Sequence, residues 1–285
     1  MRTPFRVLSY RTAGLAALVV LSSMIIDIAG RQLDWPMYAM AFAVRDVPSW
    51  VALPVVIFIA ASVSSTVGFA FSAIAAAMIF HFVPDHVEAV QIMMAASIAL
   101  QAYCVASMYR TISLRACAPF LLGGIVTMPA GIYLLLHIRA DIYVVCIGLA
   151  VALYGTYMLF RPTPHVRRGG TIADLAVGAL GGITGPLAAF PGAFLTIWCG
   201  MRGWDKVAQR SIYQPYILIM QLLTLGALSL ASKRAAVSSE MIMYALPGVA
   251  GAWLGLRVFQ KLTDVQFHMF VNMALIVSGV ALVLK

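Results

Sequence analysis

Residues 51–82 contain no Asp, Glu, Lys or Arg. A single α-helix of about 32 residues would be about 48 Å long, well beyond the ~30 Å hydrocarbon core of a bilayer. The middle of this stretch, Ser62–Phe69, is rich in hydroxyl side chains and contains Gly68. We therefore predict two short helices hinged near Gly68, which enter and leave the membrane on the same side. One strongly tilted span is the alternative.

The composition of the chain indicates an integral membrane protein. Of its 285 residues, 62% are hydrophobic and only 10% are charged, whereas soluble domains average about 25% charged residues. The apolar runs are continuous rather than alternating, which favours membrane-spanning helices over a barrel. The net charge of +9 comes from arginines in short loops rather than from a basic stripe, so it reflects membrane topology and no nucleic-acid partner is expected.

A second interrupted apolar segment lies at Gly178–Gly192, with four glycines before Pro186 and then Pro191. Glycine weakens a helix, and an interior proline breaks one. Unpaired backbone groups cost several kcal/mol each in hydrocarbon, so such a break must be lined by protein or water, and transporters place substrate sites there. The alternative is a kinked helix that packs tightly through its small residues.

The order of features repeats along the chain, which predicts an internal duplication. Residues 50–160 and 171–285 would each form a repeat, with one broken helical hairpin and three transmembrane helices. At a constant offset, the aligned glycines are Gly124, Gly131 and Gly155 with Gly248, Gly255 and Gly279. We interpret the basic, Pro- and Gly-rich residues 161–170 as a cytoplasmic linker. The expected fold is an all-α integral membrane protein with two inverted repeats and one extra N-terminal helix.

Residues 1–49 precede the first repeat and contain three arginines before an apolar run. We interpret this part as an uncleaved signal-anchor helix with a connector; a cleavable secretory signal is the alternative. With a cytoplasmic N-terminus and two re-entrant hairpins, most Lys and Arg residues fall on the cytoplasmic side of a bacterial inner membrane.

Polar side chains gather at and after the two predicted breaks. Gln214 and Gln221 share a helix face with Arg210. A polar face inside a membrane span normally faces a cavity or a partner. The alternative is that Arg210 extends to the cytoplasmic surface. Helix N-termini at the breaks would add about half a positive charge each, and no buried carboxylate is in reach. This chemistry suits a small oxyanion. The candidate substrate-binding residues are Ser64, Ser65, Thr66, Gly68, Ser72, Gln91, Gln101, Thr184, Gly185, Arg210, Gln214 and Gln221.

Motifs for other activities are missing from the sequence. It contains no GxxxxGK[ST], HExxH or GxSxG, so neither nucleotide hydrolysis nor another enzyme activity is expected. No metal site and no cofactor are expected either. The cysteines form no CxxC pair, and we interpret them as reduced thiols buried among the helices. They are Cys104, Cys117, Cys146 and Cys199.

In each half the broken segment is followed by a helix with a characteristic start. Gly178–Gly192 precedes Val207–Ser211, and Gly68–Ser72 precedes Ala89–Gln91. In these motifs the chain resembles the sulfite exporter TauE/SafE family of bacterial inner-membrane permeases over roughly residues 50–285. Phe-Ala-Phe-Ser-Ala replaces the family's consecutive glycines in the first half, and Gln209-Arg210 stand where small residues are usual.

The resemblance implies secondary export of sulfite, sulfonates or related small organic anions, driven by ion gradients. The expected partners are therefore a small anionic solute, the lipid bilayer and a coupling ion, with a homo-oligomer as a further option. The alternative function is a non-transporting membrane subunit that anchors or assembles a partner protein. This alternative predicts no solute flux and a co-purifying protein.

The re-entrant arrangement makes a topological prediction for the segment after the first break. A reporter fused at residues 84–87 should report the outer face of the membrane, because the hairpin returns to the side from which it entered. Alkaline phosphatase and fluorescent-protein fusions distinguish the two faces. A cytoplasmic signal at these positions would refute the topology.

Overall fold

The computed structural model describes residues 49–283 apart from residues 73, 76–78, 80–85, 138–144, 146–147, 150–151, 158, 160–168 and 233–242. The described part is helical, without strands, and its elements are α3 (Ser49–Val67), α5 (His86–Ser107), the short 3-10 helix η1 (Tyr109–Thr111), α6 (Leu114–His137), α8 (Gly170–Ala188), α9 (Ala193–Met201), α10 (Lys206–Ser232), α12 (Ala245–Lys261) and α13 (Asp264–Val283). The expected signal-anchor helix, Cys146 and most of the linker lie outside the described residues.

The helices have the length and surface of membrane spans. Glu88–Ser107, Leu114–His137 and Lys206–Leu230 are each long and apolar enough to cross a bilayer. Large apolar side chains point outward, with Ile172 86% and Leu230 84% exposed. Water-soluble proteins do not leave so many such side chains uncovered, and lipid is the environment that covers them. The chain is therefore a multi-pass membrane protein.

Polar residues at the ends of the apolar runs define where the helices begin. Asp205 Oδ1 accepts the backbone N–H groups of Val207 and Ala208, both at 2.9 Å, as an N-cap of α10. Thr263 and Gln266 exchange hydrogen bonds between side chain and backbone at the start of α13, which is a capping box. These caps satisfy amide groups that the first helical turn leaves without intrahelical partners.

The helix α3 ends at Val67, and the next two unusual backbone conformations lie just beyond it. Gly68 has φ 95° and Ala70 has φ 70°, both in the left-handed region. Glycine adopts this conformation freely, whereas for alanine it is strained. Helical residues resume at Phe71. The predicted interruption near Gly68 is confirmed.

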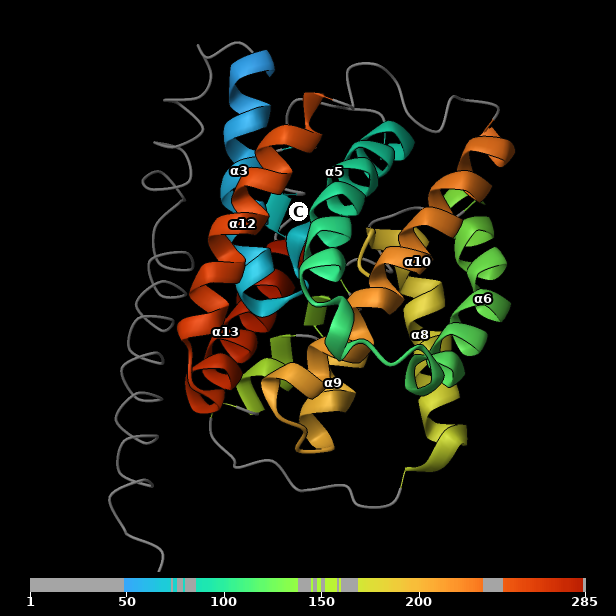
Figure 1. The fold of residues 1–285 in the computed structure, drawn as a ribbon. Coiled ribbons are helices and arrows are strands. Elements are labelled where there is room, and N and C mark those ends of the chain that lie inside the picture. The colour runs from blue at the N-terminus through green and yellow to red at the C-terminus, as the bar shows by residue number, and fades with distance from the viewer. Residues whose placement is uncertain are drawn as a thin grey trace, which may run out of the picture.

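The second interruption is a hairpin between α8 and α9. Trp198 Nε1 donates a hydrogen bond to Asp174 Oδ1 at 2.7 Å. In one continuous helix these two residues would lie about 36 Å apart, so the chain must reverse between them. Figure 1 shows α8 rising from the lower edge of the molecule and α9 returning toward it. The reversal occurs after Ala188, where Ala189 has φ 52° and Pro191-Gly192 form a turn.

The prediction placed the break over Gly178–Gly192, and for the first part of that stretch it was wrong. The helix α8 continues through Pro186 to Ala188. Its glycines serve the alternative purpose, close packing: a Cβ at Gly178 or Gly182 would overlap with the backbone of α6 at Phe120 or Gly124. Thr127 on α6 reinforces this contact by donating to Ala179 O at 2.7 Å.

The helix α12 packs on α3 in the same manner (Figure 1). A Cβ at Gly251 would overlap with Phe58 O, and one at Gly255 would overlap with Ser62 O. Thus α6 covers the second broken helix, and α12 covers the first. The two interruptions are held between these pairs and the central helices α5 and α10.

The glycine contacts predict different results for two alanine substitutions. Gly182→Ala should destabilise the protein by roughly 1–3 kcal/mol, because its Cβ would force α6 and α8 apart. Gly226→Ala on α10 is the matched control, since nothing lies within 4 Å of its Cβ and alanine favours a helix. Thermal unfolding in detergent should show a lower Tm for Gly182→Ala only; equal Tm values for both variants would contradict the packing argument.

Candidate functional site

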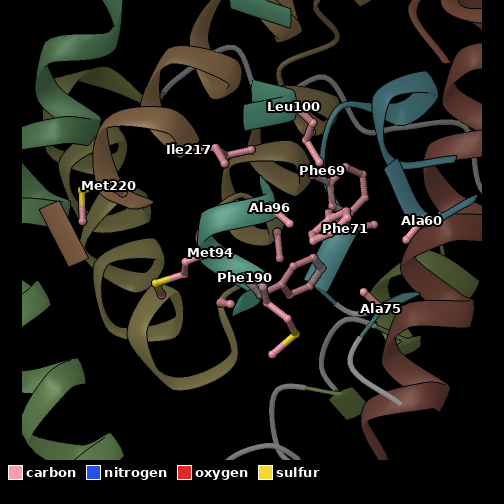
Figure 2. Packing of buried hydrophobic residues seen from close by; sticks show 14 of the residues in the cluster. Ala60, Phe69, Phe71, Ala75, Met94, Ala96, Leu100, Phe190, Ile217 and Met220 are labelled. Atoms are coloured by element: carbon pink, nitrogen blue, oxygen red, sulfur yellow. The ribbon is translucent and has the colours of Figure 1, made fainter. Parts of the chain in front are cut away.

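The two interruptions meet in the interior of the molecule. Ser72 Oγ, just after the first break, donates to Ala189 O of the second break at 2.5 Å. The rings of Phe69 and Phe190 lie 5.9 Å apart and tilted by 33°. Figure 2 shows Phe69, Phe71 and Phe190 gathered near Ile217 of α10. The expectation that the two breaks converge is therefore confirmed.

Hydroxyl groups hold the shape of each break. Ser64 Oγ donates to Phe69 O at 2.5 Å, which satisfies a carbonyl that the interrupted helix cannot pair. Thr184 Oγ1 shares its hydrogen between Leu180 O at 3.0 Å, in its own helix, and Phe190 O at 3.3 Å, in the second break. These hydroxyls were predicted as donors to an anion, but in this conformation their hydrogen atoms are directed to the backbone. Thr66 likewise donates to Ser62 O and to Gly255 O, which ties α3 to α12.

The helix α10 supplies further donors to the broken helices. Tyr213 Oη donates to Val67 O at 2.7 Å, and Gln214 Nε2 donates to Gly68 O at 3.2 Å. Tyr216 Oη donates to Gly178 O at 2.7 Å. Tyr213 and Tyr216 were not among the predicted site residues, although two tyrosines on either side of Pro215 in an apolar helix indicate hydroxyl groups that need partners.

A small cavity lies where the breaks face α5 and α10. Its volume is about 10 Å³, which suffices for about one water molecule. Its polar lining comes from Ser72, Ser97, Gln101 and Gln221, and Gln221 Nε2 donates to Ser97 Oγ at 2.9 Å. Gly185 lies beside it, packed near Pro191. The space between the breaks is too small for a sulfur oxyanion, so this conformation is closed at its centre.

Arg210 lies in a second polar group between α3, α5, α10 and α12. Its side chain is fully buried, which rules out the alternative position at the membrane surface. Arg210 Nη2 lies 3.9 Å from Cys104 Sγ, and Cys104 Sγ lies 3.7 Å from Ser65 Oγ. The guanidinium carbon stands 4.1 Å from the centre of the Phe259 ring. Arg210 Nε and Nη1 have no hydrogen-bond partner among the described residues.

Acidic residues in the described part lie away from this group. Asp174 is half-buried and engaged by Trp198, whereas Glu88, Asp205 and Asp264 are exposed. None of the four is buried as Arg210 is. A buried cation without a carboxylate partner is costly by several kcal/mol, and an anionic ligand offsets that cost.

Polar residues form one stripe on α5 and another on α10, and the two stripes face each other. Ser97 bonds to Gln221, and Cys104 approaches Arg210, so the helices run antiparallel. Amide atoms along the stripes remain without partners in the described part, among them Gln101 Oε1 and Gln214 Oε1. Gln91 is also buried on α5, with Nε2 unpartnered, but it does not line the cavity.

The family model described as sulfite exporter TauE/SafE matches residues 53–282, which is most of the chain. The chain belongs to the TauE/SafE sulfite exporter family. Comparison with curated proteins and with solved structures gives no match. The family match spans both interruptions and both polar stripes, and the recognition made from the sequence motifs is confirmed.

Two of the residues that the sequence comparison set apart from the family motif lie at these sites. Phe69 packs against Phe190 and lines the small cavity between the breaks. Arg210 brings a buried charge to the neighbouring group. Gln209, beside it, points elsewhere and donates to Trp204 O at 2.7 Å. Phe69 and Phe190 thus give the closed centre an aromatic contact, and Arg210 places a cation in the neighbouring polar group.

Loss of the Tyr213 hydroxyl should weaken the first break. Tyr213→Phe leaves the buried Val67 carbonyl without this donor, which should cost about 1–3 kcal/mol of stability. Tyr133→Phe is the matched control because Tyr133 is 60% exposed. Thermal unfolding in detergent should show a lower Tm for Tyr213→Phe only; two unchanged Tm values would mean that the bond contributes little.

Proposed function

We propose that this protein is a secondary transporter that exports small sulfur oxyanions, such as sulfite and sulfonates or related organic acids, across the bacterial inner membrane. The observation that carries the proposal is the buried guanidinium of Arg210, with two nitrogens that have no partner among the described residues. A planar guanidinium can donate two parallel hydrogen bonds to an oxyanion. Membership of a family of sulfite exporters supplies the substrate class.

The facing stripes of α5 and α10 supply the path in this proposal. From Arg210 the polar residues continue along α10 through Gln214 to Gln221, opposite Gln101 and Ser97. Neutral amides can hydrogen-bond to an anion or to its water shell without holding it as tightly as a second cation would. An anion that passes along them must reach the contact between the two breaks, which is closed here.

The inverted-repeat architecture belongs to the same proposal. Its support is the reciprocal packing of α6 on α8 and of α12 on α3, in which the aligned pair Gly131 and Gly255 takes part. A Cβ at Gly131 would overlap with Ile183 O of α8, and one at Gly255 with Ser62 O of α3. Two related halves that cover each other's broken helix can exchange roles when the molecule opens to one side or the other. Residues 50–160 and 171–285 would then be the two moving units.

The proposed orientation has the N-terminus in the cytoplasm. Lys206 Nζ donates to Phe259 O and to Leu262 O, and α10 also contacts η1. The basic residues Arg110, Lys206 and Lys261, in η1, at the start of α10 and at the end of α12, thus lie at one end of the molecule. The positive-inside rule assigns that end to the cytoplasm.

The role of Arg210 is tested by anion flux into liposomes that contain the purified protein. Arg210→Gln should lower sulfite flux at least about tenfold, because the transported anion loses its charged partner. Arg210→Lys keeps the charge but not the two-pronged geometry and should retain part of the flux. Unchanged flux in Arg210→Gln would remove this residue from the mechanism.

The matched control for this experiment is Arg257→Gln. Arg257 also stacks on an aromatic ring, 4.0 Å from Trp253, but its side chain is exposed. The Arg257→Gln variant should therefore carry sulfite at the wild-type rate. Absence of flux in the wild type for sulfite and for several sulfonates, together with a co-purifying protein, would instead favour the anchoring function.

A further inference from the structure

A second, larger cavity lies at the end of the molecule that carries η1. Its volume is about 230 Å³, against about 10 Å³ between the breaks. Its wall is formed by the end of α5, η1, the start of α10 and the end of α12, and it includes Ser107, Arg110 and Phe259. This larger cavity therefore lies at one end of the molecule, apart from the closed contact between the breaks.

The one charged residue in the described lining of this cavity is a cation, Arg110. Arg110 lines it, and Lys206 Nζ stands 5.0 Å from the centre of the Phe259 ring. No carboxylate is among its lining residues in the described part. Two exposed carboxylates lie nearby on helix ends: Asp205 accepts the backbone N–H of Val207 at 2.9 Å, and Asp264 accepts that of Lys206 at 3.2 Å. The guanidinium of Arg110 gives an anion in this cavity a cationic hydrogen-bond donor.

Phe259 connects this cavity to the buried cation. Phe259 is one of the residues that line the cavity, and the guanidinium of Arg210 stacks on its ring at 4.1 Å. Arg210 itself is fully buried and does not line the cavity. Phe259 therefore borders both the open cavity and a cation whose Nε and Nη1 lack partners among the described residues.

We propose that this cavity is an anion-binding antechamber, and that Phe259 is the partition that must move before a small oxyanion reaches Arg210. The inference rests on the proposed transport function and adds to it a first binding stage and a gate. The anion would bind first beside Arg110 and would then replace the Phe259 ring as the neighbour of the guanidinium. An aromatic ring suits this position because its face attracts the guanidinium of Arg210 and its bulk closes the passage from the cavity to Arg210.

Cys104 provides a native reporter of the partition, because its thiol lies next to Arg210. The full chain is purified in detergent and treated with N-ethylmaleimide, and peptide mass spectrometry measures modification at each cysteine. Cys117 and Cys199, which are also buried and free, are internal references. Phe259→Ala should raise the modification rate of Cys104 about tenfold or more, as expected when a protected site becomes open.

The anion itself is tested with methanesulfonate, which does not react with the maleimide. It should slow modification of Cys104 in Phe259→Ala, and uncharged dimethyl sulfone should not. Adding Arg210→Gln to that variant should abolish the protection. Protection by dimethyl sulfone, or protection that survives Arg210→Gln, would overturn the anion site.

The matched control is Phe120→Ala. Phe120 is also a buried phenylalanine, 1% exposed, but it lies on α6 against α8. This variant should leave the Cys104 rate at the wild-type value. An equal rise in both variants, or no rise in Phe259→Ala, would overturn the partition.

Phe259→Ala could prevent folding, so a second measurement leaves Phe259 in place. Ser107→Cys puts a thiol on the wall of the cavity. It should react rapidly, and methanesulfonate but not dimethyl sulfone should slow the reaction. If the wild type carries sulfite in liposomes but these results fail, the antechamber is wrong and the transport function stands. Absence of flux for all sulfur oxyanions would refute the transport function itself.

Discussion

Each interrupted helix leaves backbone carbonyl groups that must find donors inside an apolar environment. An unpaired carbonyl there costs several kcal/mol, so the breaks exist only because specific side chains pair with them. Ser64 and Thr184 act from within their own helices, whereas Tyr213 and Gln214 act from α10. The position of α10 at the centre of the molecule follows from this requirement, and so does the burial of the polar stripe on which Arg210 lies.

The sequence was informative about the first break and ambiguous about the second. An apolar run that is too long for one membrane span must be tilted or interrupted, and Gly68 in its middle favours an interruption. The structure has the interruption at Gly68–Ala70. At Gly178–Gly192 glycine has two uses, close packing and chain reversal, and the composition does not separate them. Packing explains Gly178 and Gly182, while the reversal combines a left-handed alanine, Ala189, with the turn at Pro191-Gly192.

Contacts between distant parts of the chain explain what sequence reasoning missed at the site. Arg210 is one helical turn from Lys206, so its burial depended on whether α3 and α12 would cover it. Phe259 meets Arg210 only because α12 packs across α3, and no local pattern around Phe259 indicates this contact. The hydroxyls near the breaks were correctly located, but their hydrogen bonds go to carbonyls exposed by the breaks themselves.

The left-handed backbone of Ala70 and Ala189 has a consequence for movement. Glycine would hold these conformations without strain, whereas alanine carries a cost of about 1–3 kcal/mol at each position. The bond from Ser72 to Ala189 O couples the two strained turns directly. When that bond opens, both turns lose a restraint together, so the alanines bias the pair toward switching as a unit between two discrete shapes rather than bending gradually.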